Sequence, residues 1–489
     1  MDFAVFFQND LETFFPEFFL AMSLLVVLLH GSFQVESAAS LYTSLNQSFV
    51  RLSVLVLFLS LSLLINNPIQ TQLIWSSTFI QDELSIGAKI LVLFSLLFCV
   101  LVCSPYLFSA KIRSYEIFVF FLAIALAMCL LIASYDLLSI YLSIELLSLV
   151  FYTLAAWKRD SAFSTEAGLK YFILGALASA ILLFGSSLVY FCMGTTNLAA
   201  LSILLDNLES SSLILSIAWL CIGSSLLFKL GAAPFHMWVA DVYEGSPAMV
   251  SQIFALVPKL GLLVVLSRLS SISFSSIWET LFCLCGLLSL FIGCMGGLGQ
   301  TKLKRLLAYS GIGHVGFLCM ALATSTLEGS QSLFFYIIIY ILSLSFLWTY
   351  VLHLDPVKKA WLSLVHSVGL VQTNPILALM LALILFSLAG IPPLAGFFAK
   401  LNIFVSLIDS SYYGLACFAV LTSVISAFYY IRLVKILYFE PQRSWVYFPS
   451  VSKSQSFVMV LSGFILIFFV LSPNLFYLFS YKLSLSLMI

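Results

Sequence analysis

Charged residues are scarce in this sequence. Aspartate, glutamate, lysine and arginine make up 9% of its 489 residues, whereas 62% of the residues are hydrophobic. Because soluble globular proteins carry about 25% charged residues, this composition excludes that class. The 21 basic and 21 acidic residues balance, so no net charge attracts nucleic acid or anionic substrates. We therefore expect a membrane protein that binds no nucleic acid.

Motifs for cofactors, metals and cleavable leaders are also missing. The sequence has no Walker loop, no dinucleotide-binding fingerprint and no pair of histidines at the centres of apolar runs, where a membrane haem would need them. Its ten cysteines form no C-x-x-C motif and lie almost entirely in apolar runs, which favours buried small hydrophobes over disulfides or an iron–sulfur cluster. The acidic N-terminal segment lacks an A-x-A-like cleavage site, so we interpret it as a retained first span.

Long apolar runs fill most of the chain instead. A membrane-spanning helix needs about 20 apolar residues, and this criterion predicts about fourteen spans. The expected fold class is therefore an all-α polytopic membrane protein with one membrane domain over residues 1–489. The predicted spans are 14–31, 50–66, 86–105, 115–133, 136–157, 167–192, 212–240 (broken), 247–268 (kinked), 274–298, 303–325, 331–353, 375–408 (broken), 413–438 and 455–478.

The charges between the spans predict an orientation. Loops after odd-numbered spans are basic and loops after even-numbered spans are mostly acidic, with Arg268 as the main exception. By the positive-inside rule both termini should face outward, which agrees with an even number of spans. The basic residues are Lys111, Arg113, Lys158, Arg159, Lys302, Lys304, Arg305, Lys358, Lys359, Arg443 and Lys453, and the acidic ones are Asp82, Glu83, Asp206, Glu209, Glu328 and Asp409.

Two of the predicted spans contain helix-breaking proline beside a lysine. The seventh span has Pro234 near Lys229, and the twelfth has Pro392 and Pro393 before Lys400. The two spans lie five positions apart, and an odd offset reverses orientation, so the pattern predicts inverted repeats around a transport site. Coincidence between two Pro/Gly-rich helices is the alternative interpretation. The corresponding division is 1–114 (three helices), 115–270 (first repeat, helices 4–8), 271–440 (second repeat, helices 9–13) and 441–489 (helix 14).

Several charged residues should lie inside the membrane. Glu145 falls between Asp136 and Lys158, near the middle of its span, where a charged group costs about 3 kcal/mol. Lys259 directly follows Pro258, and a proline in a helix frees the carbonyl four residues before it. A protonated glutamate or a lysine that snorkels to the membrane edge would be the structural alternatives.

The buried charges together predict a proton relay. Burial disfavours the charged form of a lysine, whereas a nearby carboxylate favours it, so a lysine between these influences can gain or lose a proton. Glu145, Lys229, Lys259 and Lys400 are the candidate relay residues. We expect Glu145 and Lys229 to face one another near the middle of the membrane, because pairing offsets the cost of either charge alone. His314 could join them because histidine titrates near neutral pH, although a structural role is equally open. For Lys170 we expect an ion pair with Glu166 one turn earlier at the membrane edge.

Four segments resemble the signature segments of the antiporter-like subunits of respiratory complex I. They are EAGLKYFILGALAS, FKLGAAPFHMWVADVYEGSPAMV, KLKRLLAYSGIGHVGF and LAGIPPLAGFFAK. The resemblance covers most of the chain from span four to span thirteen, and these motifs are long and specific. The chain departs at Ala399, where relatives often have glycine. The opening FFPEFFLAMSLLVVLLHG is more similar to the mitochondrial versions than to the chloroplast ones.

The resemblance implies a proton-pumping membrane-arm subunit with two inverted five-helix repeats and discontinuous helices 7 and 12. It assigns Glu145 to the fifth span, Lys229 to the broken seventh, Lys259 to the eighth and Lys400 to the broken twelfth. It further implies no redox cofactor in this chain, with NAD, FMN, iron–sulfur clusters and ubiquinone in partner subunits.

The implied partners are other membrane-arm subunits, neighbouring antiporter-like subunits among them, and membrane lipids. The implied location is the mitochondrial inner membrane, with a bacterial plasma membrane or thylakoid as alternatives. Two alternative functions remain: a subunit of a multi-subunit cation/proton antiporter, and a structural spacer between neighbouring subunits.

Overall fold

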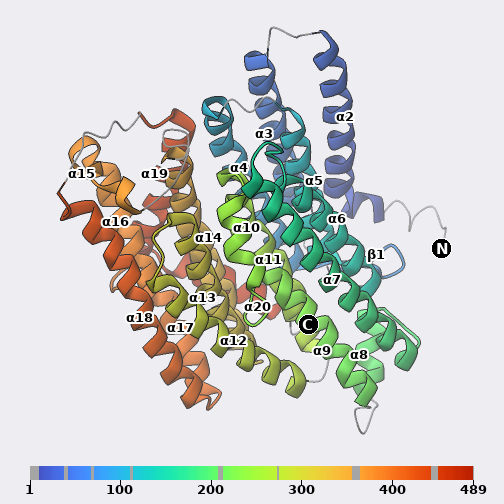
Figure 1. Cartoon of the computed structure of the whole chain (residues 1–489). Coiled ribbons are helices and arrows are strands. Elements are labelled where there is room, and N and C mark those ends of the chain that lie inside the picture. The colour runs from blue at the N-terminus through green and yellow to red at the C-terminus, as the bar shows by residue number, and fades with distance from the viewer. Residues whose placement is uncertain are drawn as a thin grey trace.

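The computed structural model describes residues 10–37, 42–67, 71–110, 114–206, 213–272, 275–354, 364–441 and 450–487. Within these ranges the chain is almost entirely helical (Figure 1). The exception is a hairpin of β1 (Gln72–Ile74) and β2 (Phe79–Gln81), paired antiparallel with Leu73 opposite Ile80. The fold class predicted from the sequence is confirmed.

Thirteen helices in the described ranges are long and apolar enough to cross a membrane. They are α2 (Phe15–Ser37), α3 (Tyr42–Asn66), α4 (Glu83–Ser109), α5 (Glu116–Ala133), α6 (Leu137–Ala155), α7 (Ala162–Met193), α9 (Leu213–Leu230), α11 (Ala248–Ile272), α12 (Ser275–Leu298), α13 (Leu303–Ala323), α14 (Leu327–Leu354), α18 (Tyr413–Tyr438) and α19 (Lys453–Phe468), which continues into η2 (Phe469–Leu471). Shorter helices are α8 (Leu198–Asp206), α10 (Met237–Gly245), η1 (Leu364–Ser367), α15 (Leu370–Thr373), α16 (Pro375–Ala389), α17 (Ala395–Asp409) and α20 (Asn474–Leu485).

The region predicted as the broken twelfth span forms α16 and α17, two 15-residue helices. This pair accounts for the difference between about fourteen predicted spans and thirteen continuous helices. The predicted last span, 455–478, is wrong at its C-terminal end, because α19 stops at Phe468 and α20 is a separate helix after Pro473. Proline cannot continue a helix that precedes it without losing a backbone hydrogen bond.

The core is formed by helices that are buried on every side. The membrane-length windows of α11 and α14 are completely buried, and both helices lie centrally in Figure 1, with α2 and α3 at one edge and α16 and α18 at the other. A helix that is hydrophobic all round is expected to lie inside a bundle or a membrane protein. By contrast, about a quarter of the corresponding windows of α7 and α18 is buried, so most of their surface is available to lipid or to partner subunits.

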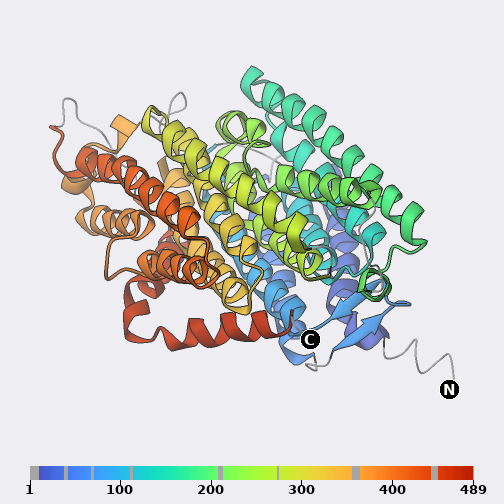
Figure 2. The same ribbon diagram turned by 90° about the horizontal axis from the view of Figure 1, so that it is seen from below.

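Contacts at the helix ends show which loops share a face of the bundle. The backbone N–H of Trp75 in the hairpin donates to Asp10, just before α2, and Leu483 of α20 packs against Gly87 of α4. Figure 2 shows α20 in red, running across the bundle toward α4. The described beginning and end of the chain therefore lie on the same face, as an even number of crossings requires.

The opposite face carries basic residues. Lys302, at the start of α13, pairs with Glu244 of α10, and the ammonium of Lys304 donates to the carbonyl of Ser246 at 3.3 Å. This arrangement agrees with the predicted alternation of loop charge. The predicted loop residues Lys111, Arg113, Glu209, Lys358, Lys359 and Arg443 lie outside the described residues.

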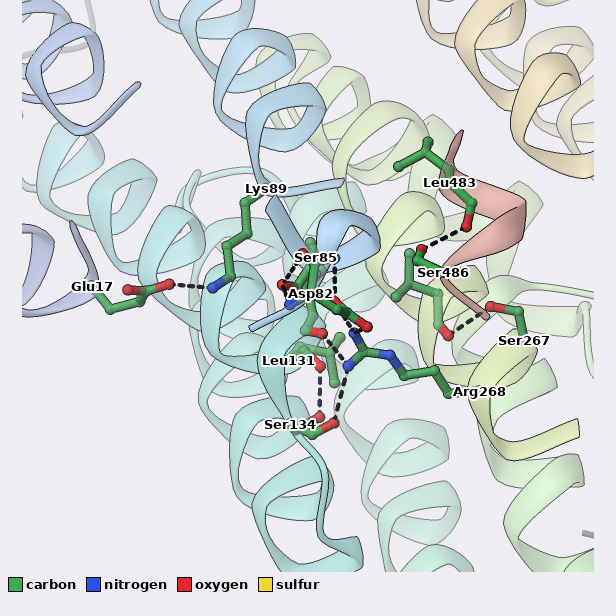
Figure 3. A network of polar contacts seen from close by, with 12 residues as sticks. Glu17, Asp82, Ser85, Lys89, Leu131, Ser134, Ser267, Arg268, Leu483 and Ser486 are labelled. Carbon is green, nitrogen blue, oxygen red and sulfur yellow. Dashed lines mark hydrogen bonds and ion pairs between the residues drawn. The ribbon is translucent and has the colours of Figure 1, made fainter. Parts of the chain in front are cut away.

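Arg268, the exception to the predicted charge alternation, forms a buried ion pair. Its guanidinium donates to both carboxylate oxygens of Asp82 at 2.7 and 2.9 Å, and to the carbonyl of Ile132 at 2.8 Å. Asp82 also caps α4 by accepting from the N–H of Ser85. A second buried pair joins Lys89 of α4 to Glu17 of α2 at 2.5 Å (Figure 3). These pairs tie the N-terminal helices to the rest of the bundle.

Candidate functional site

The helix breaks near Lys229 and Lys400 share one local geometry. Helix α9 ends at Leu230 before Gly231, and α16 ends at Ala389 before Gly390. Both glycines have left-handed backbone, with φ of +78° and +88°, a conformation that glycine adopts without the steric cost of a side chain. In each case the next N–H bonds back to the carbonyl five residues earlier, at 3.0 and 3.1 Å. The chain then restarts as α10 and α17.

Four of the five predicted site residues are buried: Lys229 (9% exposed), Lys259 (5%), His314 (6%) and Lys400 (5%). Glu145 is half-buried on α6. None of the three lysines forms an ion pair with a carboxylate in the described part of the chain. Each of these three amines therefore lies inside the bundle and is solvated by neutral groups.

Lys229 does not contact Glu145 directly, so the predicted face-to-face ion pair is absent from the described structure. A series of hydroxyls on α6 lies between the two residues instead. The Ser148 hydroxyl is 3.2 Å from a Glu145 carboxylate oxygen, and Tyr152 lies one turn further along the same helix. The Tyr152 hydroxyl is 3.5 Å from Nζ of Lys229.

The carbonyl of Phe228, the residue before Lys229, accepts a hydrogen bond from a side chain other than the lysine. The indole Nε1 of Trp238, on α10, donates to the carbonyl of Phe228 at 2.9 Å. Trp238 and Lys229 line the same cavity, together with Ser148 and Pro258. The half-helix after the break thus caps the half-helix before it, and the lysine is left facing the cavity.

Lys259 lies against a tyrosine of α14. Its Nζ is 2.5 Å from the Tyr340 hydroxyl and 4.8 Å from the centre of the tyrosine ring. Gly311 of α13 leaves room for the amine, since a Cβ at that position would lie 3.3 Å from Nζ. Pro258 does not interrupt α11, which is helical on both sides of it.

His314 is held between two tyrosine hydroxyls. Nδ1 is 2.7 Å from the hydroxyl of Tyr336 on α14, and Nε2 is 3.0 Å from that of Tyr430 on α18. Its ring centre is 4.9 Å from that of Tyr340. A neutral imidazole with a tyrosine on each nitrogen can donate one hydrogen bond and accept the other.

Lys400 caps the helix that ends in front of it. Nζ donates to the carbonyls of Leu388 and Ala389 at 3.0 and 2.9 Å, which the end of α16 leaves without helical partners. The amine also lies 5.5 Å from the ring centre of Phe317. A cavity between α13, α14, α16 and α17 is lined by polar groups of His314, Tyr336, Tyr340, Ser343, Ser387 and Lys400.

Lys170 forms the predicted ion pair with Glu166, at 2.8 Å, and a second one with Asp241 of α10, at 2.9 Å. Both pairs are solvent-exposed. Asp241 and Glu244 also face Arg305 of α13. This link was not predicted from the sequence, although Asp241 and Glu244 stand together at helical spacing in the longest motif.

The tyrosines that contact Lys229, Lys259 and His314 were also not predicted from the sequence. Tyr336 and Tyr340 are one turn apart in an otherwise apolar stretch of α14, and a buried tyrosine usually needs a partner for its hydroxyl. That spacing was an available signal. Among the described residues, no three His, Cys, Asp or Glu side chains are grouped in a way that could hold a metal ion.

Residues 134–426 match the family described as NADH:quinone oxidoreductase/Mrp antiporter, TM. NADH-ubiquinone oxidoreductase chain 2 of Marchantia polymorpha is 38% identical over 98% of this chain and 99% of that protein. NADH-quinone oxidoreductase subunit N of Pelagibacter ubique is also 38% identical, over 89% of this chain and 91% of its own length. A chain of respiratory complex I from Thermus thermophilus superposes with a TM-score of 0.77 at 29% identity, covering 94% of this chain and 98% of that one.

The chain therefore belongs to the NADH:quinone oxidoreductase/Mrp antiporter transmembrane family. Within this family its sequence is similar to chain 2 of the plant enzyme and to subunit N of the bacterial one, along nearly the whole length of each. It is a multi-pass membrane protein.

Proposed function

We propose that this chain is a proton-translocating subunit of the membrane arm of an NADH:quinone oxidoreductase. It takes part in the reaction as a subunit of that enzyme, and its own residues move protons while quinone is reduced elsewhere in the complex. The similarity to NADH-ubiquinone oxidoreductase chain 2 over 98% of the chain favours this function over a subunit of a cation/proton antiporter.

The observation that carries the proposal is the set of buried amines without carboxylate partners. An isolated ammonium inside the membrane costs several kcal/mol, so Lys229, Lys259 and Lys400 each release a proton readily when a neighbouring charge changes. In the proposed path Lys229 passes its proton toward Lys259, and Lys259 passes one toward His314 and Lys400. Glu145 controls the first step, because its charge favours the protonated form of Lys229.

The proposed organisation comprises two inverted repeats, 115–270 and 271–440, after an N-terminal three-helix unit, 1–114, and before a C-terminal region, 441–489. The two glycine-terminated helix breaks at Gly231 and Gly390 support it, since paired interrupted helices mark the sites of repeat-built transporters. The face with Lys302 and Lys304 is then the matrix side, by the positive-inside rule.

The proposed partners are the other membrane-arm subunits, neighbouring antiporter-like subunits among them, and membrane lipids, in the mitochondrial inner membrane or, as the alternative, a bacterial plasma membrane. NAD, FMN, iron–sulfur clusters and ubiquinone are assigned to the partner subunits. Respiratory complex I would migrate near a megadalton on a native gel, and an antiporter far below that mass.

The test is the number of protons pumped per electron in the reconstituted complex. Lys229→Ala should abolish pumping while the complex still assembles, and Glu145→Gln should lower the rate. Lys229→Arg should also impair pumping because arginine keeps its charge at any accessible pH. Lys435→Ala, at an exposed position on α18, is the control and should pump normally. A normal ratio in Lys229→Arg would leave Lys229 with a structural role only.

A further inference from the structure

Tyrosine hydroxyls stand beside three of the four basic side chains of the proposed path. Lys229 faces Tyr152, Lys259 faces Tyr340, and His314 lies between Tyr336 and Tyr430. Lys400 is the exception, because backbone carbonyls hold it. A phenol hydroxyl both donates and accepts a hydrogen bond, so it can take up one proton while it releases another.

We propose that Tyr340 is a proton-conducting residue that joins Lys259 to the cavity shared by His314 and Lys400. This inference rests on the proposed function and adds a residue to the path. Among the hydroxyls beside the basic side chains, that of Tyr340 makes the shortest contact, 2.5 Å to Nζ of Lys259. Its ring also faces His314, with 4.9 Å between the ring centres.

The position of α14 makes Tyr340 the connection between the two halves of the chain. Lys259 belongs to α11, and His314 and Lys400 belong to α13 and α17. Tyr340 contacts Lys259 and lines the cavity with His314 and Lys400. In the described structure no hydrogen bond links Lys259 to His314 directly, so a proton that leaves Lys259 for the second half meets Tyr340 first.

The transfer leaves Tyr340 unchanged. An N–H bond of the Lys259 ammonium breaks as an O–H bond forms at Tyr340, and the original hydroxyl proton of Tyr340 leaves for an acceptor in the cavity. Lys259 becomes neutral and the acceptor gains one positive charge. Hydroxyls of Ser343 and Ser387 lie in the same lining, and a polar site with two to four partners can hold a water molecule that passes the proton to His314 or Lys400.

Tyr336 and Tyr430 have a different part. Each contacts one nitrogen of His314, so together they orient the imidazole ring. They are positioning residues for His314, whereas Tyr340 contacts the amine that gives up the proton. The distinction makes Tyr340 the sharper position for a test.

The test compares two tyrosines of the same helix. Tyr340→Phe removes the hydroxyl and keeps the ring, and the matched control is Tyr350→Phe, whose buried hydroxyl has no hydrogen-bond partner in the described structure. In the complete reconstituted complex we expect Tyr340→Phe to slow proton pumping and coupled quinone reduction by about tenfold or more. Tyr350→Phe should pump at the normal rate. Normal pumping in assembled Tyr340→Phe would overturn the inference.

A second substitution separates conduction from structure. Replacing Tyr340 by 3-fluorotyrosine keeps the ring, the hydroxyl and the packing, but makes the hydroxyl more acidic. We expect the pH profile of pumping to shift while assembly and thermal stability of the complex stay normal. This substitution tests the inference even if the complex with Tyr340→Phe does not assemble. An unchanged profile would reject conduction through Tyr340. Lys259→Ala, measured in parallel, tests the underlying function. Normal pumping in Lys259→Ala would reject the relay itself. Loss of pumping in Lys259→Ala together with normal pumping in the Tyr340 variants would reject only the role of Tyr340.

Discussion

The two helix breaks have the same backbone geometry but treat their lysines differently. At the first break, Trp238 donates a hydrogen bond to the carbonyl of Phe228, and Lys229 faces a cavity with a tyrosine hydroxyl 3.5 Å from its Nζ. At the second break, Lys400 itself donates hydrogen bonds to the carbonyls of Leu388 and Ala389. An ammonium at a helix C-terminus is stabilised by the carbonyls and by the helix dipole. Lys400 therefore stabilises the end of α16 through its own hydrogen bonds, whereas Lys229 does not stabilise the end of α9 in this way.

The largest expected difference is in stability. Lys400→Met keeps the side-chain volume and leaves two buried carbonyls without their donor, so we expect a loss of about 2–3 kcal/mol. The matched Lys229→Met removes a costly buried charge with no strong hydrogen bond, and should be neutral or stabilising. Thermal unfolding of the purified complex, with hydrogen exchange around residues 386–391, measures both. Equal destabilisation by the two variants would contradict the comparison.

Alanine substitutions at Gly231 and Gly390, the glycines with left-handed backbone, should distinguish the two helix breaks further. Each substitution forces a side chain into left-handed backbone, at a cost of roughly 1–2 kcal/mol. At Gly231 the new Cβ would lie 2.6 Å from Val239, whereas at Gly390 it would lie 3.1 Å from the flexible side chain of Lys400. We expect Gly231→Ala to lower the unfolding temperature more. Gly390→Ala should instead reduce pumping by displacing Lys400. A larger drop in unfolding temperature for Gly390→Ala and a larger loss of pumping for Gly231→Ala would contradict this comparison.

The indole cap of the first break can be tested by a smaller change. Trp238→Phe removes the donor to the carbonyl of Phe228 and should destabilise the protein by about 1–2 kcal/mol. Trp219→Phe is the control, because the buried indole nitrogen of Trp219 has no hydrogen-bond partner in the described structure. Thermal unfolding of both variants gives the difference. Identical losses would mean that the bond to Phe228 does not stabilise the break.

The smallest expected effect concerns the hydroxyl between Glu145 and Tyr152. Ser148→Ala removes it, and with a hydrogen bond worth about 0.5–1.5 kcal/mol we expect pumping to slow by a few-fold. Ser143→Ala, on the same helix, removes a buried hydroxyl that bonds to the carbonyl of Ile140 within its own turn. That control should pump normally. If both variants slowed equally, Ser148 would not link Glu145 to the lysine.

Much of the fold could be predicted from the sequence because its causes are local. Apolar runs longer than the membrane thickness gave the helices, and Gly–Pro clusters beside Lys229 and Lys400 located the interruptions. Burial of the three lysines followed from their position inside apolar runs. The ion pair of Lys170 with Glu166 needed only the spacing of one helical turn.

The partners of the buried charges were decided by tertiary structure alone. Tyr152, Tyr340 and Asp82 reach their partners across 77, 81 and 186 positions of the sequence. Such contacts depend on how each helix is rotated about its axis. The membrane-length windows of α11 and α14 are buried on every side, so these helices have no apolar stripe that reveals which face meets which neighbour. The sequence by itself determined that these charges enter the membrane; packing of the helices decided that Lys229 meets Tyr152 rather than Glu145, and that Lys400 meets backbone carbonyls.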